Sequence, residues 1–557
     1  MLKKILLLLL VAVLASGILL TGCSKTKETT TAVPPTSTTI PPTSTSPGTT
    51  TPGTTTPATT PATTTPAPST LTPQTGGTLR VISGAEVTSF MVGEMYSPED
   101  MVQRTPSIET LVRYDPIKQQ PVPFLAESAI EDSAGKTVTF KLRSGVNFQD
   151  GTVCDAQAIK WNLDQEVKAP NTAPDFVDVS SIDVIDSLTV KVSFSVWDNS
   201  FLREMCWDSA VISPSAYDKN GLDWARTNPC GTGPFKLVTF QRDVKKEFQK
   251  WDGYWQKGKP YLDGIVINII ADPTVQLASL LKGENDVLGG LNPTDAKTVK
   301  ENAGLVVQQA EAANGTYICL AGDSANADSP FAKLAVRQAV SYAIDREAIK
   351  KYVYYDYAEV TNGLNSPQCW TYNPNVVGYS FSPDKARVLL GDAGYSGGFQ
   401  ATLYCRPEKY YKDMATAIQS NLADVGIKMD LQVLNTGQYG QMFFGTGWTN
   451  GMFIGGMVGD PEMGVVGRFF FSKAAGIGFS NSIIHPDEVE AAINNMMTAT
   501  NNDDKKASAW LLDSLAIDKY CMVTPLLTSA PLTAFSIKVH DPYITQGWTY
   551  TESWKEK

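Results

Sequence analysis

The sequence predicts an α/β protein built from several packed units, and two observations carry this prediction. From about residue 76 onward, segments with alternating apolar residues, typical of strands, take turns with amphipathic segments typical of helices. The chain also has 557 residues, more than one hydrophobic core accommodates, so two or three packed units are expected. Such alternation is typical of helices packed on a mostly parallel sheet.

The predicted elements have recognisable patterns and ends. The segment KTVTFKLRSG alternates apolar and polar residues, as a half-buried strand does, and Asp155 is placed to cap the helix that follows. The apolar run IVINII predicts a buried strand. Similar patterns predict strands at 78–83, 187–195, 231–240, 399–405 and 427–434, and helices at 156–167, 272–284, 331–353, 382–394, 410–426, 485–497 and 503–521.

The first 22 residues have the pattern of a secretory signal peptide. Lys3 and Lys4 precede an apolar run that is shorter than a bilayer span requires. A plain N-terminal membrane helix is the alternative. The segment ends in LTGC, which resembles a bacterial lipobox and so implies cleavage before Cys23 and lipidation of its thiol.

Residues 23–75 are predicted to be a lipidated cysteine followed by a disordered stalk. This stretch consists mainly of Thr, Pro, Ser and Ala, as in TTTPGTTTPATTPATTTPAPST, and offers almost no apolar side chains to bury. Its prolines favour an extended polyproline II chain of about 3.1 Å per residue. Thr/Pro stalks of this kind are also candidates for O-glycosylation.

The charge and the metal-binding residue types exclude several functions. The chain has 46 basic and 57 acidic residues and no Lys/Arg run, which argues against a nucleic-acid partner. The seven cysteines after Cys23 lack CxxC spacing, and their pairing cannot be deduced from the sequence. The only histidines are His485 and His540, far apart in the chain. We therefore predict neither a metal site nor a cofactor.

The segment GWTNGMFIGGMVGDPEM (447–463) is predicted to be a loop. Its glycines disfavour both a helix and a strand, and it has no ionisable side chain before Asp460. A loop this apolar is expected to cover or bind something, because exposed apolar patches are uncommon on soluble proteins. We expect it to line a ligand site.

Nine segments together resemble one family. They are LVRYDP, PFLAES, VTFKLRSGVNFQDGT, CGTGPFKL, GYWQKGKPYLDGIVINII, LLKGENDV, RQAVSYAIDREAI, KARVLLGDAGY and IQSNLADVGIK. In this order they resemble the extracellular solute-binding proteins of family 5, the oligopeptide, dipeptide and nickel receptors of ABC importers. The resemblance covers about 76–525. Each segment alone is a weak signal, whereas the ordered set is specific.

The resemblance implies a two-lobe clamshell of the periplasmic-binding-protein type (type II, cluster C) with an inserted subsidiary domain. Lobe I would comprise 76–107, 230–314 and 525–557, the inserted domain 108–229, and lobe II 315–524. The lobes would close on a ligand at the hinge. The implied function is a monomeric, lipid-anchored receptor on the extracellular face of the cytoplasmic membrane. It would deliver a peptide-like solute to the permease subunits of an ABC importer.

Candidate ligand contacts come from both implied lobes. In lobe I, Glu86 and Ser89 are the polar residues of the loop after the first strand. In lobe II, Tyr404 and Arg406 stand at the end of a strand, where α/β sheets usually bind ligands. Arg406 would either bind a carboxylate or form a surface ion pair.

The loop 447–463 supplies three further candidates. Trp448 is the expected stacking surface, Asn450 its nearest polar group, and Asp460 the first acid. Peptide binders of the resembled family carry an acid about three residues after the aromatic residue, and here that acid is missing. Glu86 or Asp460 would then receive a ligand amine, or the ligand has no free amine there.

The sequence also allows four other interpretations. GYSGG (394–398) fits the hydrolase elbow G-x-S-x-G, but a helix is predicted before it and a strand after it, the reverse of that motif, so no enzyme is predicted. Trp251, Tyr254 and Trp255 favour core packing over ligand stacking. An uncharged oligosaccharide is the alternative ligand. A rigid adhesin on a stalk is a further alternative.

Overall fold

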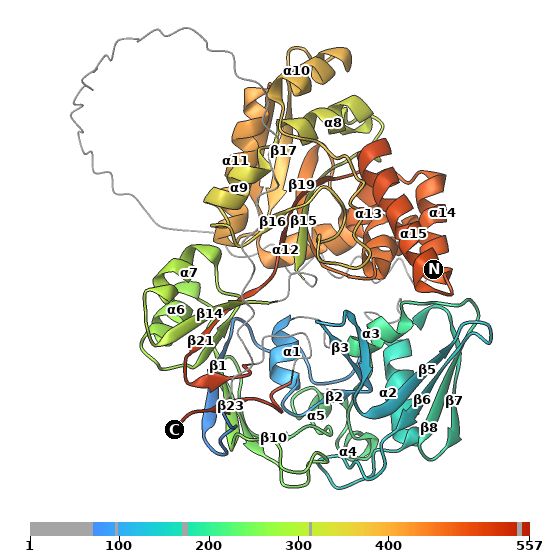
Figure 1. Cartoon of the computed structure of the whole chain (residues 1–557), viewed down its shortest axis with the longest axis vertical. Coiled ribbons are helices and arrows are strands. Elements are labelled where there is room, and N and C mark those ends of the chain that lie inside the picture. The colour runs from blue at the N-terminus through green and yellow to red at the C-terminus, as the bar shows by residue number, and fades with distance from the viewer. Residues whose placement is uncertain (1–70, 95–97, 170–175, 311–314, 543–548) are drawn as a thin grey trace, which may run out of the picture. The chain divides into compact units, whose positions relative to one another are not determined.

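The structure is a computed structural model that describes residues 71–94, 98–169, 176–310, 315–542 and 549–557. The predicted signal peptide, Cys23 and nearly all of the stalk lie outside the described residues. Three main sheets, of seven, six and four strands, organise the described chain (Figure 1). Within these ranges, no helix is both long enough and apolar enough to cross a bilayer.

The seven-stranded unit is assembled from distant parts of the chain. Its sheet has the order β10-β11-β12-β1-β13-β21-β14, and only β1 is parallel to its neighbours. Helices α6 (Pro273–Leu281) and α7 (Pro293–Lys300) pack on one side through apolar residues. The strands are β1 (Thr78–Ser83), β10 (Phe235–Gln241), β11 (Lys245–Lys250), β12 (Gly264–Ile269), β13 (Val287–Gly289), β14 (Leu305–Gln309) and β21 (Leu532–Ser536).

The six-stranded unit has the strand order β16-β20-β15-β19-β17-β18. β17 is parallel to β18 and β19, and every other pair is antiparallel, so the prediction of mostly parallel sheets is wrong for both units. The chain passes from β14 into β15 and returns from β20 into β21, and these strands pair antiparallel in each sheet. The strands are β15 (Thr316–Gly322), β16 (Glu359–Val360), β17 (Phe399–Cys405), β18 (Ile427–Val433), β19 (Gly451–Val458) and β20 (Thr524–Ser529).

Two hydrophobic clusters hold helices against the six-stranded sheet. One cluster contains residues of α8 (Leu334–Ala343), α9 (Arg346–Tyr352), α10 (Pro383–Asp392) and α11 (Lys409–Asp424). The other contains residues of α12 (Thr436–Gly440), α13 (Gly478–Ser482), α14 (Asp487–Thr498) and α15 (Asn502–Ser514). The helix predicted over 331–353 is in fact divided into α8 and α9, because Ile344 is extended and Asp345 caps a new helix.

The four-stranded unit is antiparallel, with the order β5-β6-β8-β7. Asp155 caps α2 (Ala156–Lys168) by accepting a bond from the Ala158 amide, as predicted. The strands are β5 (Ala126–Asp132), β6 (Thr137–Leu142), β7 (Val179–Asp186) and β8 (Thr189–Phe194). The other elements described are α1 (Pro98–Arg104), β2 (Glu109–Thr110), β3 (Val112–Asp115), β4 (Gln120–Pro123), α3 (Phe201–Asp208), β9 (Ala210–Val211), α4 (Pro214–Asn220), α5 (Leu222–Ala225), β22 (Val539–His540) and β23 (Trp554–Lys555).

The predicted loop 447–463 is mainly a strand, and this prediction is wrong. Residues 451–458 form β19 between β15 and β17 in the interior of the sheet. Gly455 and Gly456 make room for aromatic side chains: an added Cβ would lie 3.0 Å from the Phe479 ring and 2.3 Å from the Tyr411 hydroxyl, respectively. In this strand glycine provides space on both faces of the sheet, and the neighbouring strands supply the backbone hydrogen bonds.

Candidate functional site

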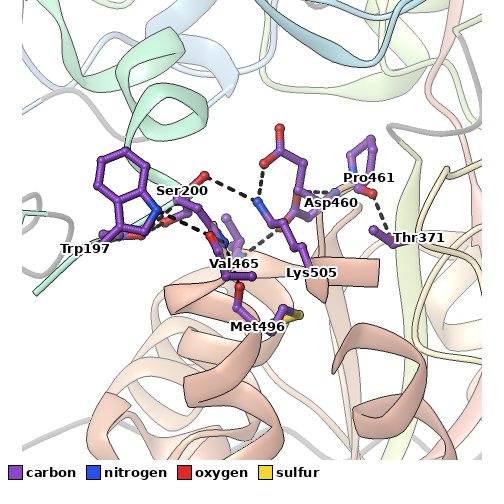
Figure 2. A network of polar contacts seen from close by, with 12 residues as sticks. Trp197, Ser200, Thr371, Asp460, Pro461, Val465, Met496 and Lys505 are labelled. Atoms are coloured by element: carbon purple, nitrogen blue, oxygen red, sulfur yellow. Dashed lines mark hydrogen bonds and ion pairs between the residues drawn. The ribbon is translucent and has the colours of Figure 1, made fainter. Parts of the chain in front are cut away.

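The segment before α3 contacts the end of α14, although the two lie about 300 residues apart in the chain. The Asn199 side-chain amide donates to the carbonyls of Met496 (2.8 Å) and Ala499 (2.9 Å). Its backbone N–H donates to Met497 (3.0 Å), and the Trp197 indole also donates to Ala499 (Figure 2). The last carbonyls of a helix have no intrahelical donor. The segment 197–199 therefore caps α14 from another part of the fold.

Two cations reinforce this contact, and each also forms an ion pair. Lys505 is almost fully buried, lies 2.5 Å from the carboxylate of Glu462, and also donates to the Asn199 carbonyl (Figure 2). Arg468 lies 2.7 Å from the carboxylate of Asp198. Each pair is shielded from water, so it is screened less than a surface pair.

Asp460 is fixed in the turn that follows β19. Its carboxylate accepts the backbone N–H groups of Glu462 (3.0 Å) and Val465 (2.8 Å), and the residue is 1% exposed. The Asn365 amide donates to the Asp460 carbonyl, and Thr371 donates to the next one, that of Pro461 (Figure 2). The side chain thus caps the helical segment that begins after it.

Arg203, on α3, is a buried cation without an acidic partner. It is 4% exposed, and no carboxylate of the described residues lies within 4.0 Å of its guanidinium. Its Cζ lies 4.2 Å from the centre of the Tyr114 ring. Burial acts to lower the Arg203 pKa, but Asp460 and other nearby groups outweigh that effect, and the pKa is raised overall. Both Arg203 Nε and the Tyr114 hydroxyl are buried without a hydrogen-bond partner among the described atoms.

The two ligand-contact candidates predicted for lobe I, Glu86 and Ser89, form internal hydrogen bonds or ion pairs. Glu86 forms an ion pair with the fully buried Lys246 and accepts the backbone N–H groups of Val87 and Asp243. Ser89 is 2% exposed and accepts the Met91 N–H at 3.0 Å. Neither side chain lies among the contacts around Asn199.

Tyr404 and Arg406 also have internal partners. Tyr404 lies in β17, opposite Phe453 of β19. Arg406 lies 2.7 Å from the carboxylate of Glu408 and packs over the rings of Tyr411 and Tyr439. Arg406 was expected either to bind a ligand carboxylate or to form an ion pair. The structure shows an ion pair, and both partners belong to the six-stranded unit.

Trp448 and Asn450 lie at the opposite end of β19 from Asp460. The eight-residue strand between them spans about 26 Å. Trp448 is 5% exposed and stacks on Phe453 at 4.8 Å, so it is a core residue and not an open stacking surface. Asn450 is exposed, and its backbone N–H donates to Asp323. The three predicted loop residues do not form one site, and only Asp460 lies beside the α3 contact.

The other sequence motifs have structural roles. GYSGG joins α10 to β17, the helix-to-strand order that was predicted. Tyr254 and Trp255 both donate to the buried carboxylate of Glu109, so this cluster is packed as expected. Among the described residues, no group of three His, Cys, Asp or Glu side chains could hold a metal ion.

A solvent-open pocket of about 420 Å³ lies apart from this contact. Its polar lining is engaged: Lys236 donates to the Gln149 carbonyl, and Asp150 accepts from Ser213 and Thr152. It contains none of the residues around Asn199 or Arg203. The α3 contact is therefore the candidate functional site.

Residues 120–474 match the profile of the bacterial extracellular solute-binding proteins, family 5 (middle region). This match covers more than half of the chain. The chain belongs to this family. Membership agrees with the resemblance seen in the sequence, and it places the α3 contact in a family of solute receptors.

Curated relatives and solved structures agree with this assignment. The glutathione-binding proteins GsiB of Salmonella paratyphi A and Escherichia coli K12 are 31% identical over 342 residues, which are 58% of this chain and 66% of theirs. DppA from Helicobacter pylori in complex with the peptide STSA has a TM-score of 0.75 at 23% identity, covering 87% of this chain and 99% of that one. NikA from Brucella suis in complex with Fe(III)-EDTA has a TM-score of 0.74 at 22% identity, covering 84% and 96%.

These similarities establish the fold. It is the two-lobe α/β clamshell of family 5 binding proteins (type II, cluster C) with an inserted subsidiary domain. The sequence did not single out Arg203, Tyr114, Asn199 or Lys505. The one available signal was an arginine in FLREMC, a segment whose neighbours Phe201 and Met205 are apolar and buried.

Proposed function

We propose that this chain is the substrate-binding lipoprotein of an ABC importer. It captures a peptide-like solute between two lobes and delivers it to the permease subunits. It is not an enzyme, acts as a monomer, and is held on the extracellular face of the cytoplasmic membrane by a lipid on Cys23. Lobe I is formed by 76–107, 230–314 and 525–557, lobe II by 315–524, and the inserted domain by 108–229.

The observation that carries this proposal is the Asp460 turn opposite α3. The Asp460 turn of the six-stranded unit packs on the start of α3: a Cβ added to Gly464 would lie 3.1 Å from the Ser200 Cβ and 3.7 Å from the Asp460 carboxylate. The unpaired guanidinium of Arg203 lies on the same helix, in the segment 108–229. Opposite charges presented by two parts of the fold suit a solute that carries both an amine and a carboxylate. With Glu86 paired to Lys246, Asp460 is the remaining predicted acid for a ligand amine.

Membership of the family supports a peptide-like solute, since the curated relatives are named for glutathione, a tripeptide. The oligosaccharide alternative rested on the missing acid and on the Trp and Tyr content, with Trp448 as the expected stacking surface. That side chain is buried against Phe453 and Phe479.

Native mass spectrometry of the purified protein tests this proposal, because clamshell receptors bury their solute. We expect bound species whose masses form a peptide ladder. Small-angle scattering should show that the lobes close when a mixed tripeptide library is added. A bound species with hexose spacing, or a radius of gyration that no solute changes, would contradict the proposal.

A further inference from the structure

The inference concerns the part of the solute that Arg203 recognises, and it rests on the proposed function. A buried charge without a counter-ion is costly, because its desolvation is not offset by a partner. Arg203 is 4% exposed, yet no carboxylate among the described residues lies within 4.0 Å of it. Since the guanidinium remains charged, the fold holds a cation that lacks its anion.

A second unpartnered group lies next to this cation. The Tyr114 hydroxyl is buried without a hydrogen-bond partner in the described structure, in a residue that is 1% exposed. The Arg203 guanidinium packs over the rings of Tyr114 (4.2 Å) and Trp207 (5.6 Å), which fixes its plane. A phenol O–H and a guanidinium N–H thus stand together as donors without acceptors.

The surrounding charges select the kind of anion. The negative charges of Asp460 and Glu204 raise the Arg203 pKa, and that of Glu462 raises the Tyr114 pKa. These acids would repel a phosphate, which carries up to two negative charges at neutral pH, more strongly than a group with a single charge. The planar guanidinium fork also matches the geometry of a carboxylate.

We propose that the Arg203 guanidinium and the Tyr114 hydroxyl together bind a carboxylate group of the captured solute. Arg406, the arginine that the sequence suggested for this role, is already paired with Glu408. The carboxylate site therefore belongs to the segment 108–229, and lobe II contributes Asp460 opposite it. Recognition of the solute's acidic group is then a function of the inserted domain.

The test compares two tripeptide libraries, one with free C-termini and one with C-terminal amides, by native mass spectrometry and thermal shift. Wild-type protein should bind the free acids about tenfold or more tightly than the amides, since a charge-assisted hydrogen bond is lost in the amide. Arg203→Met should remove this preference, and Tyr114→Phe should reduce it. Arg387→Met, at an exposed arginine paired with Asp384, is the matched control and should keep it.

A structural role for Arg203 gives a different result. If the residue only stabilised the fold, Arg203→Met would lower the melting temperature of the protein without solute. We expect that temperature to stay the same or rise, because an unpaired buried charge is removed. A lowered melting temperature with an unchanged acid preference would overturn the inference.

The inference and the proposed function can fail separately. Equal binding of acids and amides by wild-type protein overturns the inference and leaves the receptor function intact. If neither library binds, the proposed peptide class of solute is wrong. The solute that co-purifies with the protein then tests the carboxylate inference. A solute without a carboxylate overturns the inference, whereas a carboxylate-bearing solute that Arg203→Met fails to retain supports it.

Discussion

Gly456 lies directly against Tyr411: a Cβ on this glycine would be 2.3 Å from the tyrosine hydroxyl oxygen. Tyr411 is 2% exposed and belongs to α11, which packs on the same face of the six-stranded sheet. On the opposite face, Gly455 leaves room for Phe479 in the same way. The glycines of β19 therefore set how closely helices approach both faces of the sheet.

Gly456→Ala should destabilise the protein by about 1–3 kcal/mol, because the added methyl group overpacks a filled site. Urea denaturation followed by tryptophan fluorescence measures the change. Gly391→Ala is the matched control, since no atom lies within 4 Å of its added Cβ in α10. The control should leave stability unchanged or raise it by up to about 1 kcal/mol. Equal stabilities of Gly456→Ala and wild type would refute this account of β19.

The sequence predicted elements whose signals are local. The cap at Asp155 depends on residues within one turn, and the structure has it. The predictions from the sequence were wrong where the local structure depends on residues far away in the chain. The glycines of β19 were interpreted as strand-breaking residues. The aromatic rings that need the space beside them, Tyr411 and Phe479, lie in other segments of the chain. Trp448 looked like a ligand surface because Phe453, its stacking partner, is recognised only once β19 is known.

The site was harder to predict than the fold for a similar reason. Arg203 matters because it lacks a partner, and a missing contact has no pattern in the sequence. Asp460 could be identified because it is the first acid after an apolar stretch. It also precedes Pro461, and Asp-Pro favours a turn. Its neighbours, Lys505 and Asn199, come from segments far away in the chain.

Asn199→Ala should weaken the contact between the α3 segment and α14. The substitution removes two hydrogen bonds to helix-end carbonyls, worth about 1–3 kcal/mol together. We expect a larger radius of gyration in small-angle scattering and weaker solute binding by about tenfold. Asn228→Ala is a suitable control, because that amide also makes two bonds but to residues Trp224 and Thr227 beside it. If both variants behave alike, the Asn199 contact does not control lobe closure.

Glu109 should make stability depend on pH. Burial raises the pKa of its carboxyl to about 7, against the bonds from Trp255, Tyr254 and Thr232, which lower it. The folded state then holds its proton more tightly than the unfolded state does, so the group's contribution to stability is fully present below about pH 4.5 and is lost as the pH rises to about 7.

Glu109→Gln mimics the protonated form and cannot titrate, so it should abolish this pH dependence. The difference in unfolding free energy between wild type and the variant should change across pH 4.5–7, because wild type becomes less stable relative to the variant as the pH rises. Using the difference cancels Asp513, whose pKa burial also raises to about 7. A difference that stays constant with pH would show that Glu109 titrates alike in both states.

Asp460 has two separable roles, and two substitutions distinguish them. Its carboxylate caps the turn after β19 through the N–H groups of Glu462 and Val465. The two bonds use different carboxylate oxygens, so Asp460→Asn keeps an acceptor for only one of them. Asp460→Ala removes both acceptors and should cost about 1 kcal/mol in stability. If the negative charge receives a ligand amine, both variants should lose affinity for tripeptides with a free N-terminus and lose none for N-acetylated tripeptides.

Isothermal titration calorimetry with the two peptide forms measures this, and urea denaturation measures the cap. Asn450→Asp provides the contrasting variant, because it adds an acid at the far end of β19, where Asn450 is exposed and its backbone donates to Asp323. That change should leave peptide affinity as it is. Tighter binding by Asn450→Asp would place the amine site at the other end of the strand, and full affinity in Asp460→Asn would exclude Asp460 as that site.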